Sequence, residues 1–244
     1  MNYRNTVEFL VSGDYALFAD PVTRVGGEKC TYHIPTYEAL KGMLHSVYWK
    51  PTFIWIIDEV RIMNQIQTQS KGIRTKNYDG GNDLSIYTYL KDVKYKVKAH
   101  FEWNLNRPEL EIDRNENKHH NIAKRMIERG GRRDIFLGAR ECQGYVEPCV
   151  FEEDESFYRN TSELTFGLML HGLTYADEAI NCDDKGKMTV RFWRPKMEYG
   201  VIRFLRPESC EIKRTITEQG IKPFGKGNYI GLDEFEFEEE EVLL

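Results

Sequence analysis

A strict alternation of apolar and polar side chains over residues 93–103 constrains the fold of this chain more than any other feature. The apolar positions are Val93, Tyr95, Val97, Ala99, Phe101 and Trp103. The positions between them are Lys94, Lys96, Lys98, His100 and Glu102. Because successive side chains of a strand point to opposite faces, the pattern predicts a strand with one buried face and one mainly cationic face. The cationic face fits either a solvated sheet surface or a track for phosphate groups.

A first helix is predicted at residues 36–48, ahead of that strand. Apolar side chains recur there at helical spacing, Thr36 is a suitable N-cap, and Pro51 prevents the helix from continuing. Tyr48 then lies in the last turn of this helix.

A second helix is predicted at residues 116–129, with a glycine pair directly after it as the stop signal. Its apolar stripe extends back to His119 at a spacing of three and four residues. His119 is therefore expected to point toward the packed side of the domain or its margin, with Lys118 and His120 flanking it.

Three further strands are predicted, at residues 6–11, 52–69 and 135–146, and the glycine-rich residues 70–83 are interpreted as a flexible basic loop. The order strand, helix, strand, strand, helix, strand is the β-α-β-β-α-β ferredoxin-like pattern shared by RNA-recognition folds. Three short strand-like runs after Pro148 predict a small antiparallel sheet.

These elements predict an α+β protein with a ferredoxin-like (RRM-like) domain followed by a small antiparallel β-sheet domain. The expected boundaries are 1–147 for an RNA-binding and catalytic domain, 148–216 for the sheet domain, and 217–244 for a flexible acidic tail.

The distribution of charge favours a nucleic-acid partner, although the net charge of −5 does not. Seven acidic residues lie in the last twelve positions, and without them 34 basic residues face 32 acidic ones. Residues 91–140 carry thirteen Lys and Arg against eight Asp and Glu. A local basic surplus of this kind is typical of a phosphate-binding surface and also occurs on ordinary solvated faces.

The five cysteines are scattered and contain no C-x-x-C pair, so neither a disulfide framework nor a structural zinc site is predicted. We expect no cofactor, no metal and a reducing, cytoplasmic environment. No apolar segment is long enough to span a bilayer, so no membrane partner is expected.

Lys118 and His119 together suggest chemistry on RNA. The 2′-hydroxyl of RNA can act as nucleophile without a metal if a base removes its proton, an acid protonates the 5′-oxygen and a cation stabilises the phosphorane. An imidazole suits either proton transfer, and Lys118 supplies fixed positive charge. Tyr48 is a candidate third group, but spacing alone leaves it among fourteen tyrosines.

A metal-dependent nuclease is the competing chemistry. It needs convergent carboxylates, for which Asp58 with Glu59 or Asp113 with Glu116 are the candidates. Adjacent residues on a strand face opposite sides, and the second pair lacks further partners, so this alternative is less favoured.

Several stretches resemble the CRISPR-associated Cas-five family in its d variant, found in type I-C systems. They are GDYALFADPVTRVGGEK, PTYEALKGMLHSVYWKPT, YTYLKDVKYKVKAHFEWN, DRNENKHH and, most specifically, GGRRDIFLGARECQGYV. The resemblance covers roughly residues 6–210, and the acidic end lies outside it.

The resemblance implies a metal-independent endoribonuclease of the RAMP superfamily that cleaves precursor CRISPR RNA within each repeat. The implied cut lies at the 3′ base of the repeat hairpin and leaves a 5′-hydroxyl and a 2′,3′-cyclic phosphate. The enzyme then stays on the 5′ handle with other subunits of the type I-C surveillance complex. The family's catalytic positions fall on Tyr48, Lys118 and His119, and His120 stands where some relatives have Tyr, so a partial substitution for His119 is left open.

The same resemblance supplies an alternative, since many Cas-five relatives are non-catalytic scaffolds that cap the 5′ end of the guide RNA. Both functions require RNA binding, and DNA is left open as a second partner. The expected RNA-binding residues are Lys71, Arg74, Lys76, Lys94, Lys96, Lys98, His120, Arg132 and Arg133.

Overall fold

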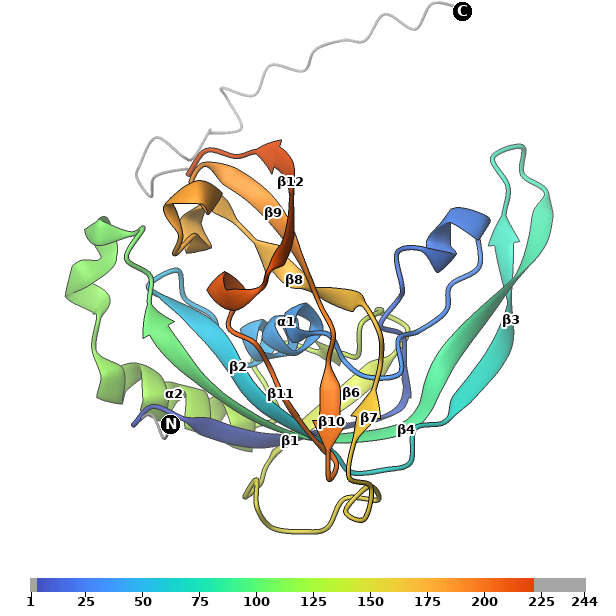
Figure 1. Ribbon diagram of the computed structural model, residues 1–244, viewed down its shortest axis with the longest axis horizontal. Coiled ribbons are helices and arrows are strands. Elements are labelled where there is room, and N and C mark those ends of the chain that lie inside the picture. The colour runs from blue at the N-terminus through green and yellow to red at the C-terminus, as the bar shows by residue number, and fades with distance from the viewer. Residues whose placement is uncertain (1–3, 222–244) are drawn as a thin grey trace, which may run out of the picture.

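The computed structural model describes residues 4–221. In Figure 1 the long strands form a curved sheet, α1 lies above it, and a hairpin of two strands rises at the right. The helices and strands in chain order are β1 (Val7–Ala16), α1 (Tyr37–Val47), β2 (Phe53–Ile62), β3 (Thr68–Lys76), β4 (Asn82–Trp103), α2 (Glu116–Glu128), β5 (Ile135–Phe136), β6 (Gln143–Pro148), β7 (Leu164–Thr165), β8 (Met169–Thr174), β9 (Lys187–Trp193), β10 (Lys196–Glu198), β11 (Val201–Arg203) and β12 (Ile212–Glu218).

Nine strands form one sheet, in the order β5-β6-β1-β4-β2-β11-β10-β7, with β3 paired to β4 off this path. All of its pairings are antiparallel. The predicted alternating strand is the second half of β4 and lies between β1 and β2, with Val97 opposite Phe9 and Val60. Its apolar face is buried as predicted, and the predicted combination of helices with mainly antiparallel sheets is confirmed.

The first half of β4 forms the projecting hairpin with β3, and Lys76 pairs with Asn82 next to its turn. The interpretation of residues 70–83 as a flexible loop was therefore wrong. Gly72 lies inside β3, whereas Gly80 and Gly81 belong to the turn, where Gly80 has a φ of 85° and donates its N–H to the Asn77 carbonyl at 3.0 Å. Positive φ favours glycine, which is why the composition of a tight turn resembles that of a loop.

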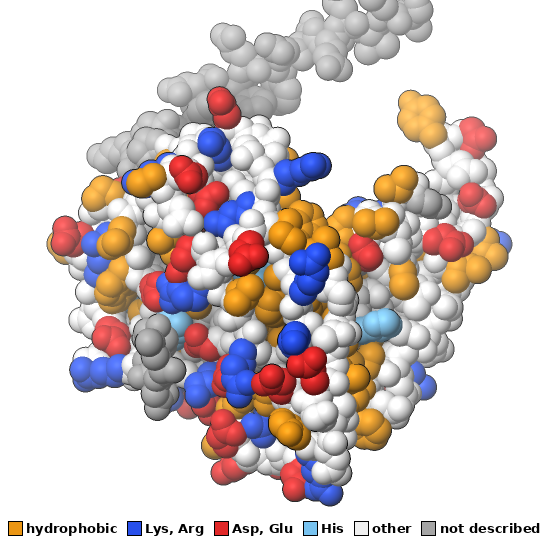
Figure 2. Space-filling view, viewed as in Figure 1, with side chains coloured by type: hydrophobic (Ala, Val, Ile, Leu, Met, Phe, Trp, Pro, Cys, Tyr) orange, Lys and Arg blue, Asp and Glu red, His pale blue; other side chains and the backbone are white. Residues whose placement is uncertain are grey.

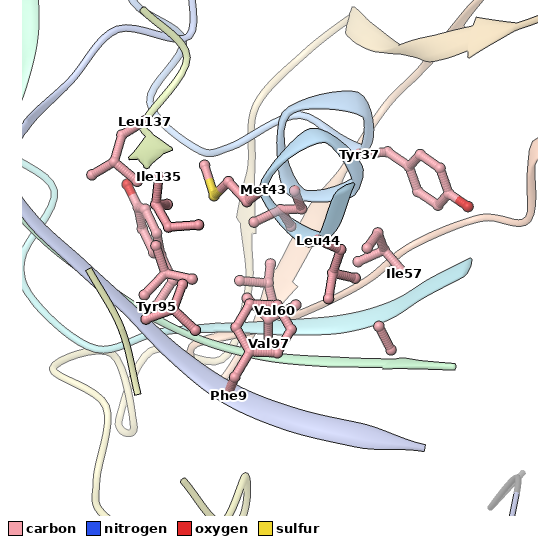
Figure 3. Close-up of a cluster of buried hydrophobic side chains, with 14 of the residues drawn as sticks. Phe9, Tyr37, Met43, Leu44, Ile57, Val60, Tyr95, Val97, Ile135 and Leu137 are labelled. Atoms are coloured by element: carbon pink, nitrogen blue, oxygen red, sulfur yellow. The ribbon is translucent and has the colours of Figure 1, made fainter. Parts of the chain in front are cut away.

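Helix α1 forms where the sequence predicts it. The Thr36 hydroxyl accepts the Ala39 N–H at 3.1 Å, and the backbone is extended again at Tyr48, three residues before Pro51. Met43 and Leu44 point from α1 onto the sheet in Figure 3.

Helix α2 also has the predicted bounds. The Asn115 side chain accepts the Lys118 N–H at 3.0 Å, and Gly130 and Gly131 follow the helix with φ values of 80° and 110°. Ala123 and Ile127 are buried in the same core as α1, and the helix contacts β1 and β6.

The strands after β6 are divided between two sheets. β8, β9 and β12 form a separate three-stranded sheet, which contacts α1 through β8. β7, β10 and β11 extend the main sheet, because β11 pairs with β2 from Val201 opposite Arg61 to Arg203 opposite Glu59. The expected single small sheet after Pro148 is thus only partly correct, and strand pairing crosses the predicted boundary between residues 147 and 148.

Other predicted strands differ in length. The first extends to Ala16, residues 52–69 contain β2 and the start of β3, and residues 135–146 are divided between β5 and β6. The division occurs at Gly138, where a Cβ would lie 2.2 Å from the Leu17 carbonyl oxygen. Of the predicted tail, Thr217 and Glu218 belong to β12, while residues 222–244 lie outside the described residues.

Candidate active site

The end of α1 and the first turn of α2 bring Tyr48 and His119 into contact. The Tyr48 hydroxyl lies 2.7 Å from Nδ1 of His119, and the two rings are stacked with centroids 6.0 Å apart. Tyr48 reaches this position because the helix ends there, and its N–H still bonds to the Leu44 carbonyl at 2.8 Å. His119 reaches it because the Asn115 cap starts α2 three residues before Lys118.

His119 is completely buried among aromatic rings. Its ring centroid lies 5.2 Å from that of Phe53, 6.3 Å from that of Phe101 and 5.9 Å from that of Trp103. These three side chains come from β2 and the end of β4. The sheet therefore supplies rigid walls for the imidazole, while its two nitrogens face polar partners.

The second nitrogen of His119 faces Asp113, in the loop that leads into α2. Nε2 lies 2.8 Å from the Asp113 carbonyl oxygen and 3.4 Å from its carboxylate oxygen Oδ2. The same carboxylate pairs with the half-exposed ammonium of Lys118 and accepts the Thr52 hydroxyl at 2.8 Å. Lys118 and His119 are thus joined through one acidic residue.

The charges around the site shift two pKa values. Burial raises the pKa of Tyr48 to about 12, the Asp113 carboxylate adds to the rise, and Arg132 opposes it. The hydrogen bond from Lys118 lowers the pKa of Asp113, and the Thr52 hydroxyl lowers it further. Burial raises this pKa, but its effect is smaller than that of Lys118. At neutral pH the phenol is therefore protonated and the carboxylate is ionised.

Comparison with known proteins identifies the family of the chain. The model of the Cas_Cas5d family, described as CRISPR-associated protein (Cas_Cas5), matches residues 6–205. The chain belongs to the Cas5d family. Its resemblance to that family, read from the sequence, is confirmed.

Individual Cas5d relatives extend the match over most of the chain. A protein of Mannheimia succiniciproducens named CRISPR pre-crRNA endoribonuclease Cas5d is 26% identical over 238 residues, which cover 86% of this chain and 99% of the relative. A solved structure described as a CRISPR-associated protein is 36% identical, with a TM-score of 0.72, and covers 86% of this chain and 96% of that one. A functionally uncharacterized protein from Streptococcus mutans is 38% identical, with a TM-score of 0.71 and coverages of 86% and 97%.

The lysines on the cationic face of β4 do not form an open track in this Cas5d chain. Residues that follow β6 cover the face, and the Lys96 ammonium is buried against the carbonyls of Val150, at 2.9 Å, and Glu153, with the Asp154 carboxylate at 2.8 Å. The expectation of a free Lys96 is therefore wrong, because its charge is already neutralised inside the protein.

The neighbours of Lys96 on this face differ in exposure. Lys94 is exposed, Lys98 lies 4.0 Å from Glu8, and His100 is buried beside Asp58 at 2.8 Å. Of the alternating cationic side chains, Lys94 therefore stays open to solvent and Lys98 partly so.

The other predicted RNA-binding residues lie in two places. Lys71, Arg74 and Lys76 project from β3 in the hairpin, where the Lys71 ammonium lies 3.1 Å from the ring centroid of Tyr15. Arg132 and Arg133 are exposed in the turn after α2, and both donate backbone N–H groups to the Ser46 carbonyl near the end of α1. The arginine turn therefore lies next to the Tyr48 end of the site.

His120 points away from His119. Its Nε2 lies 3.0 Å from the Thr6 carbonyl, ahead of β1. This interaction holds His120 at the start of the sheet, so in this conformation it does not share the aromatic pocket of His119.

Convergent metal ligands are absent from residues 4–221, where no three His, Cys, Asp or Glu side chains gather in a metal-binding arrangement. Asp58 bonds to His100 instead, and Glu59 pairs with Arg203 at 3.1 Å. The five cysteines are free thiols. Within the part of the chain that the structure describes, no helix combines the length and apolar character needed to cross a membrane.

Sequence reasoning missed Asp113 and Thr52 as members of the site. Asp113 was considered only with Glu116 as a metal-binding pair. The sequence feature that could have identified Asp113 is its position two residues before the helix cap Asn115. A residue at that position lies close to the first turn of α2. The carbonyl contact to His119 has no signature in a side-chain pattern.

Proposed function

We propose that this chain is a metal-independent endoribonuclease that cleaves precursor CRISPR RNA within the repeat. The proposed cut lies at the 3′ base of the repeat hairpin and leaves a 2′,3′-cyclic phosphate and a 5′-hydroxyl. The observation that carries the proposal is the 2.7 Å contact of Tyr48 with His119, beside the half-exposed Lys118 ammonium. The name of the Mannheimia succiniciproducens relative, a pre-crRNA endoribonuclease, supports the substrate class.

The proposed reaction is a transesterification. The 2′-hydroxyl gives its proton to Tyr48 Oη as Tyr48 passes its own proton to His119 Nδ1, and the 2′-oxygen attacks phosphorus. The bond from phosphorus to the 5′-oxygen breaks, that oxygen takes a proton from solvent, and His119 later returns its proton to solvent. Lys118 stabilises the negative charge that develops on the phosphorane.

Tyr48 is the proposed contact with RNA because both nitrogens of His119 are already hydrogen-bonded. Tyr48 is only 4% exposed in the free protein, so RNA must widen the opening at the end of α1 as it docks. Lys118, whose side chain is 49% exposed, and the exposed Arg132 are placed to attract the phosphate.

RNA phosphates are proposed to contact the hairpin and the arginine turn as well. The members of this surface are Lys71, Arg74, Lys76, Lys94, Lys98, His120, Arg132 and Arg133. Lys96 leaves the set because its ammonium is bound internally. Cations and anions are mixed on the face shown in Figure 2. This mixture supports separate contact points for RNA and does not support one continuous basic surface.

We also propose a ferredoxin-like unit made of β1, α1, β2, β4, α2 and β6. The strand order β6-β1-β4-β2, with antiparallel neighbours and one helix after β1 and one after β4, supports it. Retention on the 5′ handle within a type I-C complex and a reducing cytoplasmic location belong to the same proposal. The free thiols support the last of these.

The test is cleavage of the repeat RNA from the chain's own CRISPR array in the presence of EDTA. Wild type is compared with Lys118→Ala and His119→Ala, and binding is measured on the same RNA with a 2′-deoxynucleotide at the cut site. Cleavage by wild type that is lost in both variants, with binding retained, is the expected result. Tight binding without cleavage by wild type contradicts the enzyme and leaves the scaffold that caps the guide RNA.

A further inference from the structure

Asp113 makes polar contacts with three residues of the candidate site. Its backbone carbonyl bonds to His119, and its carboxylate pairs with Lys118 and accepts the Thr52 hydroxyl. Asp113 is itself partly buried, at the end of the 3-10 helix Pro108–Asp113. The described residues offer no further metal ligands around Asp113, so its contacts need a different explanation.

The carbonyl of Asp113 decides which nitrogen of His119 carries the proton. A carbonyl oxygen can only accept a hydrogen bond, so Nε2 of His119 is the donor across the 2.8 Å contact. In the neutral imidazole the other nitrogen then has a lone pair. Tyr48 therefore donates its O–H to Nδ1 across 2.7 Å, and His119 is prepared to receive the Tyr48 proton.

The Thr52 hydroxyl holds the carboxylate of Asp113 in place. Thr52 is 1% exposed, and its carbonyl accepts the Asn104 N–H at 2.9 Å, so its hydroxyl is a fixed donor at the start of β2. That donor holds Oδ2, which lies 3.4 Å from Nε2 of His119. The other oxygen, Oδ1, is left for the Lys118 ammonium.

We infer that Asp113 is the positioning residue of this site: it fixes the tautomer of His119, stabilises the imidazolium formed during the reaction, and orients the Lys118 ammonium toward the phosphate. The inference rests on the proposed endoribonuclease function. The titratable groups in contact with His119 or its partners are Tyr48 at the end of α1, Asp113 at the end of the 3-10 helix and Lys118 from α2. Arg132, in the turn after α2, acts on Tyr48 through its charge. The aromatic rings of Phe53, Phe101 and Trp103 also surround the imidazole.

Asp113→Asn tests the inference, because it retains the backbone carbonyl and an oxygen for the Thr52 hydroxyl while it removes the negative charge. Single-turnover cleavage of the repeat RNA in EDTA is expected to slow by at least about tenfold, with little change in affinity for the 2′-deoxy RNA. Asp113→Glu is expected to recover part of the rate.

Glu111→Gln is the matched control, because it removes one negative charge from an exposed side chain on the same 3-10 helix. It is expected to leave the cleavage rate unchanged. Urea unfolding of each variant separates misfolding from mispositioning. A cleavage rate of Asp113→Asn that matches that of wild type would overturn the inference.

NMR of the histidine ring nitrogens gives a readout that does not depend on cleavage. In wild type, His119 is expected to show the Nε2–H tautomer, with Nδ1 unprotonated. Wild type that shows this signature without cutting RNA contradicts the proposed function and retains the positioning role. An Nδ1–H tautomer in wild type overturns the positioning role whatever the activity.

Discussion

The phenol of Tyr48 holds its proton firmly in this site. Burial and the Asp113 carboxylate raise its pKa to about 12, so phenolate is scarce at neutral pH. As a base, Tyr48 can therefore act only by accepting one proton as it passes on another. The acceptor it needs for the second proton is Nδ1 of His119.

Replacement of Tyr48 by Phe removes this relay and leaves the ring that packs at 5.6 Å from Phe53. We expect single-turnover cleavage of the repeat RNA to fall by about 10²- to 10⁴-fold, the range typical of general acid–base groups. Affinity for the 2′-deoxy RNA and the urea midpoint are expected to change little. Tyr95→Phe is the control, because Tyr95 is equally buried but packs against Phe18, with ring centroids 6.4 Å apart, and is not a member of the site.

Cleavage by Tyr48→Phe at the wild-type rate would contradict the relay. It would mean that His119 reaches the 2′-hydroxyl directly, after a rearrangement that frees Nδ1.

The site could be predicted from sequence only as far as local structure extends. Lys118 and His119 follow from a helix with an Asn115 cap and a clear apolar stripe. Tyr48 is 71 positions away from His119, and only the family resemblance selected it among the tyrosines. Asp113 was missed because its decisive contact is made by a backbone carbonyl, which every residue has.

At the scale of elements, the β3–β4 hairpin is the proposed RNA contact that contains none of the proposed catalytic residues. Arg74 and Lys76 are exposed near its turn. Each phosphate contact releases counterions when RNA binds, so affinity falls as the salt concentration rises. The slope of log affinity against log salt concentration therefore reports the number of phosphate contacts.

Arg74→Ala combined with Lys76→Ala is expected to lower the salt slope of binding to the 2′-deoxy repeat RNA by about one to two, depending on how many of the two cations meet phosphate. The cleavage rate at saturating enzyme is expected to stay near that of wild type. The control is Lys196→Ala, an exposed lysine on β10 that is 3.2 Å from Glu163. A salt slope equal to that of wild type would remove the hairpin from the RNA-binding surface.

Elements with strong end signals were predicted accurately, and elements that depend on distant partners were not. Thr36 and Pro51 marked the ends of α1, and the glycine pair marked the end of α2. The glycines near residue 80 gave an equally local signal, but a turn and a loop share that composition. The pairing of β11 with β2 joins residues more than a hundred positions apart, and no local pattern reports it.

At the scale of the whole molecule, His171 lies where the three-stranded sheet meets α1. Its ring stacks on Tyr37 with centroids 4.5 Å apart, its Nε2 donates to the Leu205 carbonyl at 2.9 Å, and Nδ1 accepts from Arg191 at 3.3 Å. Burial, reinforced by the Arg191 charge and only partly opposed by the Leu205 carbonyl, lowers the pKa of His171 to about 3. The folded protein therefore keeps this histidine neutral.

This shift predicts that acid loosens the whole fold. The unfolded chain binds a proton at His171 below its ordinary pKa of about 6.5, whereas the folded chain does so only near 3, so stability falls as pH drops through this window. Between pH 7.5 and pH 5 the His171 contribution to the loss is about 2 kcal/mol. Urea unfolding at both pH values measures it.

Between pH 7.5 and pH 5, the unfolding free energy of His171→Gln is expected to fall by about 2 kcal/mol less than that of wild type. The reason is that an amide can replace both hydrogen bonds of the imidazole but does not titrate. His33→Gln, at an exposed position, is the control and is expected to follow wild type. An equal pH dependence in His171→Gln and wild type would show that this histidine does not couple the fold to pH.

The 22-residue strand β4 serves both ends of the molecule, since it begins in the projecting hairpin and ends at Trp103, against the imidazole of His119. An insertion or deletion of one residue within its paired second half would turn Phe101 and Trp103 to the opposite face and open the aromatic pocket. Changes in chain length are therefore tolerated at the turn beyond Lys76, where no register has to be kept. Relatives of this protein should accordingly vary in the reach of the hairpin while they conserve the number of residues that separates its base from the pocket.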